Sequence, residues 1–229
     1  MSLSIIIPVR PPSEGKSRLA PALAPAARAM LVERMFRHVL HAATQVTAQC
    51  YVVSRSAFLR DLAVAAGAHA VAETGIGLNK ALAEASALVD PDLPVLALSA
   101  DLPLLTPADL TFCRHAGLDP ASRAKGAVAW GSGYRVEPGM TMNGEQQSIP
   151  DTADVVAATD RAGTGTNALL LRRPGLIDYA FGEGSLARHR ANAATAGLSF
   201  AVMRRAGLSA DLDEPGDLAL LDRPWFSAA

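Results

Sequence analysis

Short apolar segments rich in β-branched residues alternate along this chain with longer segments in which apolar residues recur at helical spacing. Alternation of this kind is typical of an α/β sheet whose strands are mostly parallel and whose helices cover both faces. We therefore predict a three-layer α/β fold with a mostly parallel mixed sheet. The expected strands are 4–9, 51–54, 69–72, 94–100, 153–159, 168–171 and 198–203, and the expected helices are 32–43, 58–66, 78–88, one that begins at 107, 185–196 and 214–221.

The length of 229 residues allows one large domain or two small ones, and we expect a single globular domain covering residues 1–229. Half of the 229 residues are apolar, which is enough for a sizeable core and excludes an intrinsically disordered chain. The 21 basic and 22 acidic residues leave a net charge of −1, so the chain lacks the excess of positive charge that is typical of proteins that bind nucleic acid. No segment reaches the roughly 18 apolar residues of a membrane span. The N-terminus lacks the features of a signal peptide and two cysteines make no disulfide framework, so we expect a cytoplasmic protein.

One segment does not follow the alternation. Residues 114–150 show neither helical nor strand periodicity and carry many turn formers. A loop of this length inside a compact domain is uncommon. Such a segment is either functional or disordered.

Ligands of parallel α/β sheets bind beyond the carboxyl ends of the strands. This rule selects 10–18, 73–79 and Asp101 as one candidate rim. Three cations lie in the first of these loops, namely Arg10, Lys16 and Arg18. Such a cluster suits a triphosphate, with a solvated basic loop as the alternative. The loop is not a P-loop, because an arginine stands where that motif requires its first glycine.

Carboxylates at two further points suit a divalent cation. Asp101 follows the strand expected at 94–100, and Asp211 and Asp213 lie two residues apart between a strand and the last helix. Side chains two apart in an extended segment point the same way, and magnesium binds carboxylates together with substrate phosphates. We expect Asp101, Asp211 and Asp213 to hold Mg²⁺. The alternatives are a carboxylate at a helix N-terminus for Asp101 and helix capping for Asp213.

Three glycine-rich segments are candidates for substrate binding. Residues 159–167 combine glycines with Thr and Asn donors for an anion. Residues 181–185 lead into a helix expected to begin at Ser185, and a helix N-terminus is a ready phosphate site. Residues 73–79 open another helix, where Asn79 could contact a base edge or a ribose. Taken singly, each signal is weak, because glycine-rich segments usually form turns.

A series of motifs, in order along the chain, carries a family resemblance. It consists of Ile-Pro-Val-Arg-Pro at 7–11, Lys-Ser-Arg-Leu-Ala-Pro at 16–21, Gly-Leu-Asn-Lys-Ala-Leu at 77–82, Asp-Leu-Pro-Leu-Leu-Thr-Pro-Ala-Asp-Leu at 101–110, Asp-Arg-Ala-Gly-Thr-Gly-Thr-Asn-Ala-Leu-Leu at 160–170, Phe-Gly-Glu-Gly-Ser at 181–185 with Arg188 and His189, and the segment 207–221. Together these motifs resemble the guanylyltransferases of deazaflavin coenzyme biosynthesis, the family of 2-phospho-L-lactate guanylyltransferase and its relatives. The resemblance covers the chain apart from 114–150.

The resemblance implies a nucleotidyltransferase (Rossmann-like) fold and a reaction with two phosphorylated substrates. GTP and a phosphorylated three-carbon acid give a guanosine diphospho-linked acid and pyrophosphate. Members of the family use 2-phospho-L-lactate, phosphoenolpyruvate or 3-phospho-D-glycerate, and the product passes to a transferase that loads the deazaflavin precursor of coenzyme F-420. Because a phosphate nucleophile needs no general base, the protein mainly positions the reactants and neutralises their charge.

The resemblance also suggests a role for each candidate residue. It implies that Arg10, Lys16 and Arg18 bind the triphosphate and the leaving pyrophosphate, that Asp101, Asp211 and Asp213 hold Mg²⁺, that Gly77, Leu78 and Asn79 line the guanosine pocket, and that Thr164, Thr166, Gly182 and Ser185 hold the phosphate or carboxylate of the acceptor. Arg10, Lys16, Arg18 and Asp101 form the expected catalytic set. Arg188 and His189 either support the last of these loops or are solvated surface residues.

The chain departs from the family pattern at two points, and other functions stay open. The family often has Lys at the position of Arg10, and its path across 114–150 is shorter. We therefore interpret 114–150 as an irregular insertion, and favour a tolerated surface excursion over the alternatives of a lid or a dimer arm. One alternative is a nucleotidyltransferase for another acceptor, such as a molybdopterin or a sugar phosphate, but this predicts glycines where Pro11 and Pro12 stand. Another is a non-catalytic nucleotide-binding homologue. The acid used, the preference for guanine and the oligomeric state, a homodimer included, are not resolved by the sequence.

Overall fold

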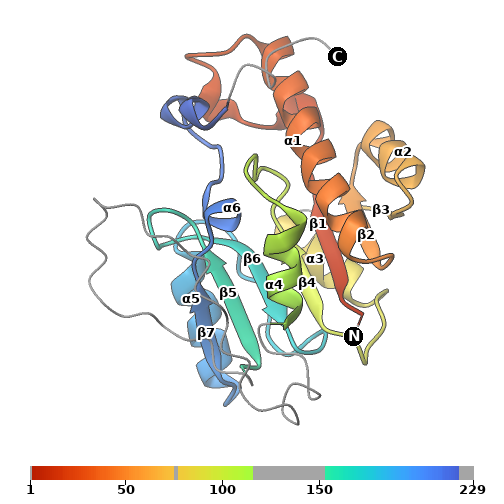
Figure 1. Ribbon diagram of the computed structural model, residues 1–229, viewed down its shortest axis with the longest axis vertical. Coiled ribbons are helices and arrows are strands. Elements are labelled where there is room, and N and C mark those ends of the chain that lie inside the picture. Colours follow the sequence, from red (N-terminus) through yellow and green to blue (C-terminus); the bar gives the residue numbers. More distant parts are fainter. Residues whose placement is uncertain (1, 75–76, 116–152, 222–229) are drawn as a thin grey trace.

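One sheet of seven strands runs through the computed structural model, which describes residues 2–74, 77–115 and 153–221 (Figure 1). The strands are β1 (Ser4–Pro8), β2 (Cys50–Ser54), β3 (His69–Ala72), β4 (Val95–Leu98), β5 (Val155–Thr159), β6 (Thr166–Leu171) and β7 (Phe200–Met203). Their order across the sheet is β3-β2-β1-β4-β6-β5-β7. Only β6 runs antiparallel to its neighbours, β4 and β5. The predicted mostly parallel α/β sheet is confirmed.

The strands are connected by α-helices and short 3₁₀ helices. The α-helices are α1 (Pro25–Val46), α2 (Ala57–Ala65), α3 (Leu78–Ser86), α4 (Pro107–His115), α5 (Ser185–Thr195) and α6 (Ala206–Ser209), and the 3₁₀ helices are η1 (Pro12–Glu14), η2 (Ser17–Leu19) and η4 (Pro215–Leu220). The longest, α1, begins well before the expected 32–43, because Pro25 at the first helical position favours initiation there.

Two expectations for the helices were wrong in detail. The helix expected at 214–221 is the 3₁₀ helix η4, whose six residues are closed at the start by reciprocal hydrogen bonds between Glu214 and Asp217. A segment so short shows no full helical period that could separate the two helix types. Arg114 and His115, which were expected to belong to the irregular segment, instead form the end of α4. The rest of the predicted insertion, apart from these two residues, lies outside the described residues.

The central strands contribute alternate side chains to two apolar cores, one on each face of the sheet, which gives the three layers. Ile5 and Ile7 of β1 pack with Phe36 of α1 on one face, while Ile6 packs with Leu82 of α3 on the other. Helices α1, α2, α4 and α6 contribute to the first core, and α3 and α5 to the second. The predicted three-layer arrangement is confirmed. None of the described helices combines the length and the apolar character needed to cross a bilayer.

The strand directions decide which loops meet. The parallel strands β1, β2, β3 and β4 all end at the same edge of the sheet. Because β6 runs the other way, its first residues, Thr166 and Asn167, lie at that edge too. The turn before β6 and the loop before α5 therefore face the segments that follow β1 and β4, which are far from them in sequence.

Candidate active site

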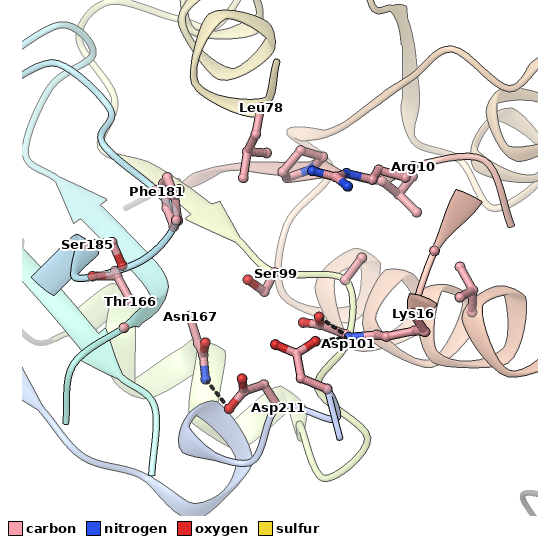
Figure 2. A pocket seen from close by; sticks show the side chains of 18 of the residues that line it. Arg10, Lys16, Leu78, Ser99, Asp101, Thr166, Asn167, Phe181, Ser185 and Asp211 are labelled. Atoms are coloured by element: carbon pink, nitrogen blue, oxygen red, sulfur yellow. Dashed lines mark hydrogen bonds and ion pairs between the residues drawn. The ribbon is translucent and has the colours of Figure 1, made fainter. Parts of the chain in front are cut away.

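A pocket of about 990 Å³ opens at the edge of the sheet where β1, β2, β3 and β4 end (Figure 2). It is lined by nearly all of the residues selected from the sequence, namely Arg10, Lys16, Arg18, Gly77, Leu78, Asp101, Thr164, Thr166, Gly182, Ser185, Asp211 and Asp213. Figure 2 shows Lys16, Asp101 and Asp211 on one side of the pocket, Thr166 and Ser185 on another, and Leu78 away from both groups. The structure thus brings together side chains from both ends of the chain.

Lys16 is the cation most firmly held in the pocket. Its Nζ lies 2.5 Å from Oδ2 of Asp101 and 2.7 Å from Oδ1 of Asp213, and its side chain is 9% exposed. Burial disfavours the charge, but the two carboxylates outweigh burial and raise the pKa of Lys16. Lys16 is therefore an ammonium at neutral pH, placed between two carboxylates.

Asp211 completes the group of carboxylates and has a different environment. The amide nitrogen of Asn167 donates to Oδ1 of Asp211 at 3.1 Å and to the carbonyl oxygen of Leu208 at 3.0 Å. Burial raises the pKa of Asp211 against this hydrogen bond, and the nearby charges of Asp101 and Asp213 raise it further. A second cation close to these carboxylates would relieve that repulsion.

The donor set fits magnesium in its chemistry, because carboxylate oxygens and substrate phosphates are the ligands that this ion takes. Across residues 2–74, 77–115 and 153–221, however, no three acidic, histidine or cysteine side chains are grouped in a way that could hold a metal ion. The ammonium of Lys16 instead lies between Asp101 and Asp213. An ion bound by these carboxylates would require Lys16 to move, so the metal site stays a prediction.

The turn before β6 is organised by Asp160, to which the sequence analysis gave no role. Its carboxylate accepts hydrogen bonds from the backbone N–H of Thr164 and of Gly165, both at 2.9 Å. A side chain at Gly165 would collide with that carboxylate, because its Cβ would lie 2.6 Å from Oδ2. Gly165, the second glycine of the Gly-Thr-Gly-Thr-Asn motif, is therefore needed for close packing within the turn, while Thr164 and Thr166 line the pocket.

The loop before α5 is shaped by glycines with left-handed backbone. Gly182 has φ +114° and Gly184, the residue before the first turn of α5, has φ +65°. Residues other than glycine rarely adopt these angles, so the two glycines of Phe-Gly-Glu-Gly-Ser are needed for the backbone conformation of the loop. The loop carries Ser185 into the pocket, where the side chain is almost fully buried.

Asn79 is the predicted site residue that the structure places elsewhere. Its amide oxygen accepts from the backbone N–H of Phe181 at 2.8 Å, and its amide nitrogen donates to the carbonyl oxygen of Phe181 at 3.3 Å. Asn79 is not among the residues that line the pocket. Its polar groups hold the loop before α5 against the start of α3, rather than pointing toward a base.

His189, a residue of α5, also holds the loop before α5 in place. Its Nε2 accepts from the backbone N–H of Ala180 at 3.0 Å, and its Nδ1 lies 3.1 Å from Oγ1 of Thr166. Burial, with a smaller effect of Arg188, lowers the pKa of His189 to about 4, so the ring is neutral. A neutral ring that accepts at Nε2 carries its proton on Nδ1 and donates it to Thr166. The hydroxyl hydrogen of Thr166 is thereby left for a partner in the pocket.

Arg55, which the sequence did not single out, forms a polar group with two glutamates from the predicted rim segments 10–18 and 73–79. Nη2 of Arg55 lies 2.6 Å from Oε2 of Glu14, and Nε lies 3.4 Å from Oε2 of Glu73. All three residues line the pocket. Arg55 directly follows β2, so the rule of carboxyl strand ends, applied to that strand as well, would have selected it.

Comparison with known proteins bears on the nature of this site. The profile of a family described as "Guanylyl transferase CofC like" matches residues 3–125 and 146–221. The "Phosphoenolpyruvate guanylyltransferase" of Rubrobacter xylanophilus is 35% identical over 226 residues, which cover 97% of this chain and 94% of that protein. The "3-phospho-D-glycerate guanylyltransferase" of Phenylobacterium zucineum is 32% identical over 217 residues, covering 93% and 86% of the two chains.

Solved structures with little sequence identity share the fold. A putative nucleotide-diphospho-sugar transferase from Desulfovibrio desulfuricans superposes with a TM-score of 0.61 at 16% identity, covering 98% of this chain and 88% of the other. A 4-diphosphocytidyl-2C-methyl-D-erythritol synthase gives a TM-score of 0.57 at 13% identity and covers 99% of both chains. The predicted nucleotidyltransferase-like fold is confirmed by these similarities.

Proposed function

Because the chain belongs to the CofC-like guanylyl transferase family and is therefore a nucleotidyltransferase, we propose that it transfers the guanylyl group of GTP to a phosphorylated three-carbon acid. Pyrophosphate is the second product. The names of its relatives make phosphoenolpyruvate and 3-phospho-D-glycerate the first acids to consider. One observation carries the proposal. A single pocket joins the cations Arg10, Lys16 and Arg18 to a glycine-rich loop at the start of a helix, as two phosphorylated substrates require.

The chemistry needs positioning and charge neutralisation rather than proton transfer. An oxygen of the acceptor phosphate forms a bond to the α-phosphorus of GTP. The bond between that phosphorus and the oxygen bridging to the β-phosphorus breaks, and pyrophosphate leaves with the bonding electrons. Arg10, Lys16 and Arg18 stabilise the charge that develops on the leaving group. The acceptor phosphate is already ionised at neutral pH, so no side chain has to act as a general base.

We propose Asp101, Asp211 and Asp213 as the residues that hold magnesium. When bound, the ion would neutralise phosphate oxygens of both substrates. The proposal is supported by the carboxylate chemistry of the group, and by the pKa of Asp211, which burial raises first and the nearby charges of Asp101 and Asp213 raise further. Lys16 would then leave its position between Asp101 and Asp213 and pair with phosphate.

We assign the acceptor to the opposite side of the pocket, against Thr166 and Ser185. Figure 2 shows these two side chains next to each other, at the start of β6 and of α5. The hydroxyl of Thr166 has a hydrogen available because His189 donates to its oxygen. Thr164 and Gly182 line the same region. This environment offers neutral donors to a phosphate or a carboxylate.

The resemblance extends the proposal to the pathway. The guanosine diphospho-linked acid would be handed to a transferase that loads a deazaflavin precursor, as in coenzyme F-420 biosynthesis. A phosphoanhydride product of this kind is a good donor in a further group transfer, because its nucleotide half is a stable leaving group.

Pyrophosphate release tests the proposed reaction. The protein is incubated with GTP and magnesium, in parallel with phosphoenolpyruvate, 3-phospho-D-glycerate and 2-phospho-L-lactate. We expect release with one of these acids and a fall of about 100-fold or more in Asp101→Asn, because Asp101 faces the phosphates. Asp61→Asn is the matched control, since Asp61 lies exposed on α2. No release with any acid, from folded protein that binds GTP, would overturn the proposed acceptor class.

A further inference from the structure

We propose that Glu73 recognises the guanine base, accepting hydrogen bonds from its N1–H and N2–H₂ groups while Arg55 holds the carboxylate in position. The inference rests on the proposed use of GTP and names the residue that selects its base. It arises from the group formed by Glu73, Arg55 and Glu14, which lines the pocket and to which the proposed phosphate chemistry assigns no role.

The order of the strands places Glu73 at the far end of the pocket from Asp101. Neighbouring strands β3, β2, β1 and β4 are followed by Glu73, Arg55, Arg10 and Asp101, so these residues leave the sheet in a row. With strands about 4.8 Å apart, roughly 14 Å separate the first and the last strand of the row. A nucleoside triphosphate extends over a comparable length. With its phosphates at Arg10 and Lys16, its base lies toward β2 and β3.

The surface beside Glu73 suits a flat, largely apolar ring. Val53 of β2 and Leu78 and Ala81 of α3 line the same pocket. Figure 2 shows Leu78 away from Lys16 and Asp211. Apolar walls that carry a few placed polar groups are typical of sites that bind a base.

The contacts of Glu73 leave acceptor capacity for a ligand. Its side chain is 13% exposed, and its Oε2 lies 3.4 Å from Nε of Arg55. Its backbone N–H donates to the carbonyl oxygen of Ser54 at 3.3 Å, which fixes the residue to the end of β2. Among the described residues, the contacts of its carboxylate involve Oε2 alone. Each carboxylate oxygen has two lone pairs, so Glu73 can accept two further hydrogen bonds.

A carboxylate at this point distinguishes guanine from adenine. Guanine presents two adjacent donors, N1–H and N2–H₂, whereas adenine presents the acceptor N1 and no group at C2. A carboxylate accepts only, so it pairs with guanine and is repelled by adenine. The alternative candidate, Asn79, already uses its amide oxygen and nitrogen on the backbone of Phe181. Glu73 therefore takes the role that the sequence suggested for Asn79.

Exchange of Glu73 for glutamine gives a test with a gain of function. Xanthosine triphosphate (XTP) keeps the N1–H of guanine but has a carbonyl in place of the N2 amino group. In Glu73→Gln the side-chain oxygen accepts from N1–H and the side-chain nitrogen donates to that carbonyl. We expect kcat/KM for GTP to fall about 10- to 100-fold and the XTP-to-GTP preference to rise at least about 10-fold. Pyrophosphate release with each nucleotide measures both values.

Glu14→Gln is the matched control, because Glu14 is the other carboxylate that pairs with Arg55. Its XTP-to-GTP preference is expected to equal that of the wild type. An unchanged preference in Glu73→Gln, with the wild type active on GTP, would overturn the role of Glu73 and leave the proposed function standing. A wild type that is inactive with GTP would instead refute the proposed function. If Glu73→Gln does not fold, Glu73→Asp serves, and an unchanged KM for GTP in that variant would refute the inference.

Discussion

Lys16 links parts of the chain that are 85 and 197 residues away, through Asp101 and Asp213. Among the described residues other than glycine, it alone has a positive φ, of 56°. A lysine in the left-handed region costs of order 1 kcal/mol. The surrounding contacts hold this conformation, which aims the ammonium into the pocket. We interpret the strain as the cost of placing a cation where it can pass from carboxylates to phosphates.

Lys16→Met is expected to remove most activity and some stability. Without the ammonium, Asp101 and Asp213 repel each other and the leaving pyrophosphate loses a cation, so kcat/KM should fall about 100-fold or more. The free energy of unfolding should fall by about 1–3 kcal/mol, below the cost for a fully buried pair because Asp213 is 46% exposed. Lys80→Met, at a lysine 65% exposed on α3, is the control. Equal kcat/KM in both variants would contradict the role of Lys16.

The buried ring of His189 predicts how stability depends on pH. Its folded-state pKa of about 4 is below the ordinary histidine value of 6.5, so the unfolded state binds a proton at higher pH than the folded state does. This contribution is fully present above pH 6.5 and is lost as the pH falls toward 4, by up to about 3 kcal/mol. Urea unfolding at pH 7, 6 and 5 measures the slope. His189→Gln should be less stable at pH 7 but lose less stability on acidification.

His41→Gln is the control for that experiment, because His41 lies exposed on α1. It should keep the steep loss of stability of the wild type. Identical slopes for the wild type and His189→Gln would show that His189 is not held neutral, and would also remove the argument that it directs the hydroxyl of Thr166.

At the scale of elements, the loop before α5 depends on the backbone conformation of its glycines as well as on side-chain contacts. A Cβ at Gly184 would meet no atom within 4 Å, so there is space for a side chain, yet φ is +65°. The same lack of neighbours holds for Gly216 in η4, where φ is not positive. The two glycines therefore separate the effect of backbone angle from that of crowding.

Gly184→Ala is expected to lower the free energy of unfolding by about 1 kcal/mol, while Gly216→Ala leaves it nearly unchanged. Because Gly184 precedes Ser185, its variant should also raise the KM for the acid several-fold with little change in the KM for GTP. Denaturant unfolding and steady-state kinetics on both variants provide the measurement. Equal stability of the two variants would mean that the left-handed angle imposes no cost.

Asn79 shows how one element holds another. Asn79 lies in the first turn of α3, and it holds the backbone of Phe181 in the loop before α5, 102 residues away. The side of the pocket proposed for the base and the side proposed for the acceptor are thus joined by one side chain. A contact of this kind cannot be seen in a motif, because the motif records the asparagine and not its partner.

At the scale of the whole molecule, the family match leaves one internal segment of the chain unmatched. The matched residues 3–125 and 146–221 leave out 126–145, which lie inside the segment predicted to be an insertion. The cost of a longer loop grows only with the logarithm of its length, so a domain tolerates such an addition. The two matched ranges, 3–125 and 146–221, contain every residue that lines the pocket.

Deletion of residues 126–145 is therefore expected to leave the reaction within about threefold of the wild type and the free energy of unfolding within about 1 kcal/mol, because loop closure changes little with length. Pyrophosphate release and urea unfolding on the shortened chain measure both. Loss of activity from a shortened protein that still unfolds cooperatively would instead assign the segment a part in catalysis.

Much of the architecture follows from local chemistry and could be predicted. The alternation of buried side chains in β1, with Ile5 and Ile7 on one face and Ile6 on the other, is set by the period of a strand. The position of Asp101 after an apolar strand is enough to predict that it lies at the ligand-binding edge of the sheet. These properties depend on neighbours in sequence, which is why a sequence displays them.

The pairings across the pocket were decided by the tertiary structure alone. The antiparallel direction of β6 brings Asn167 to Asp211, the strand order brings Arg55 to Glu73, and the path of the first loop brings Lys16 to Asp101. Each contact joins residues that no local period relates, since it depends on how strands cross over and in which direction they run. A motif therefore identifies the residue types that a site needs, whereas the packing of the sheet selects the partner that each one meets.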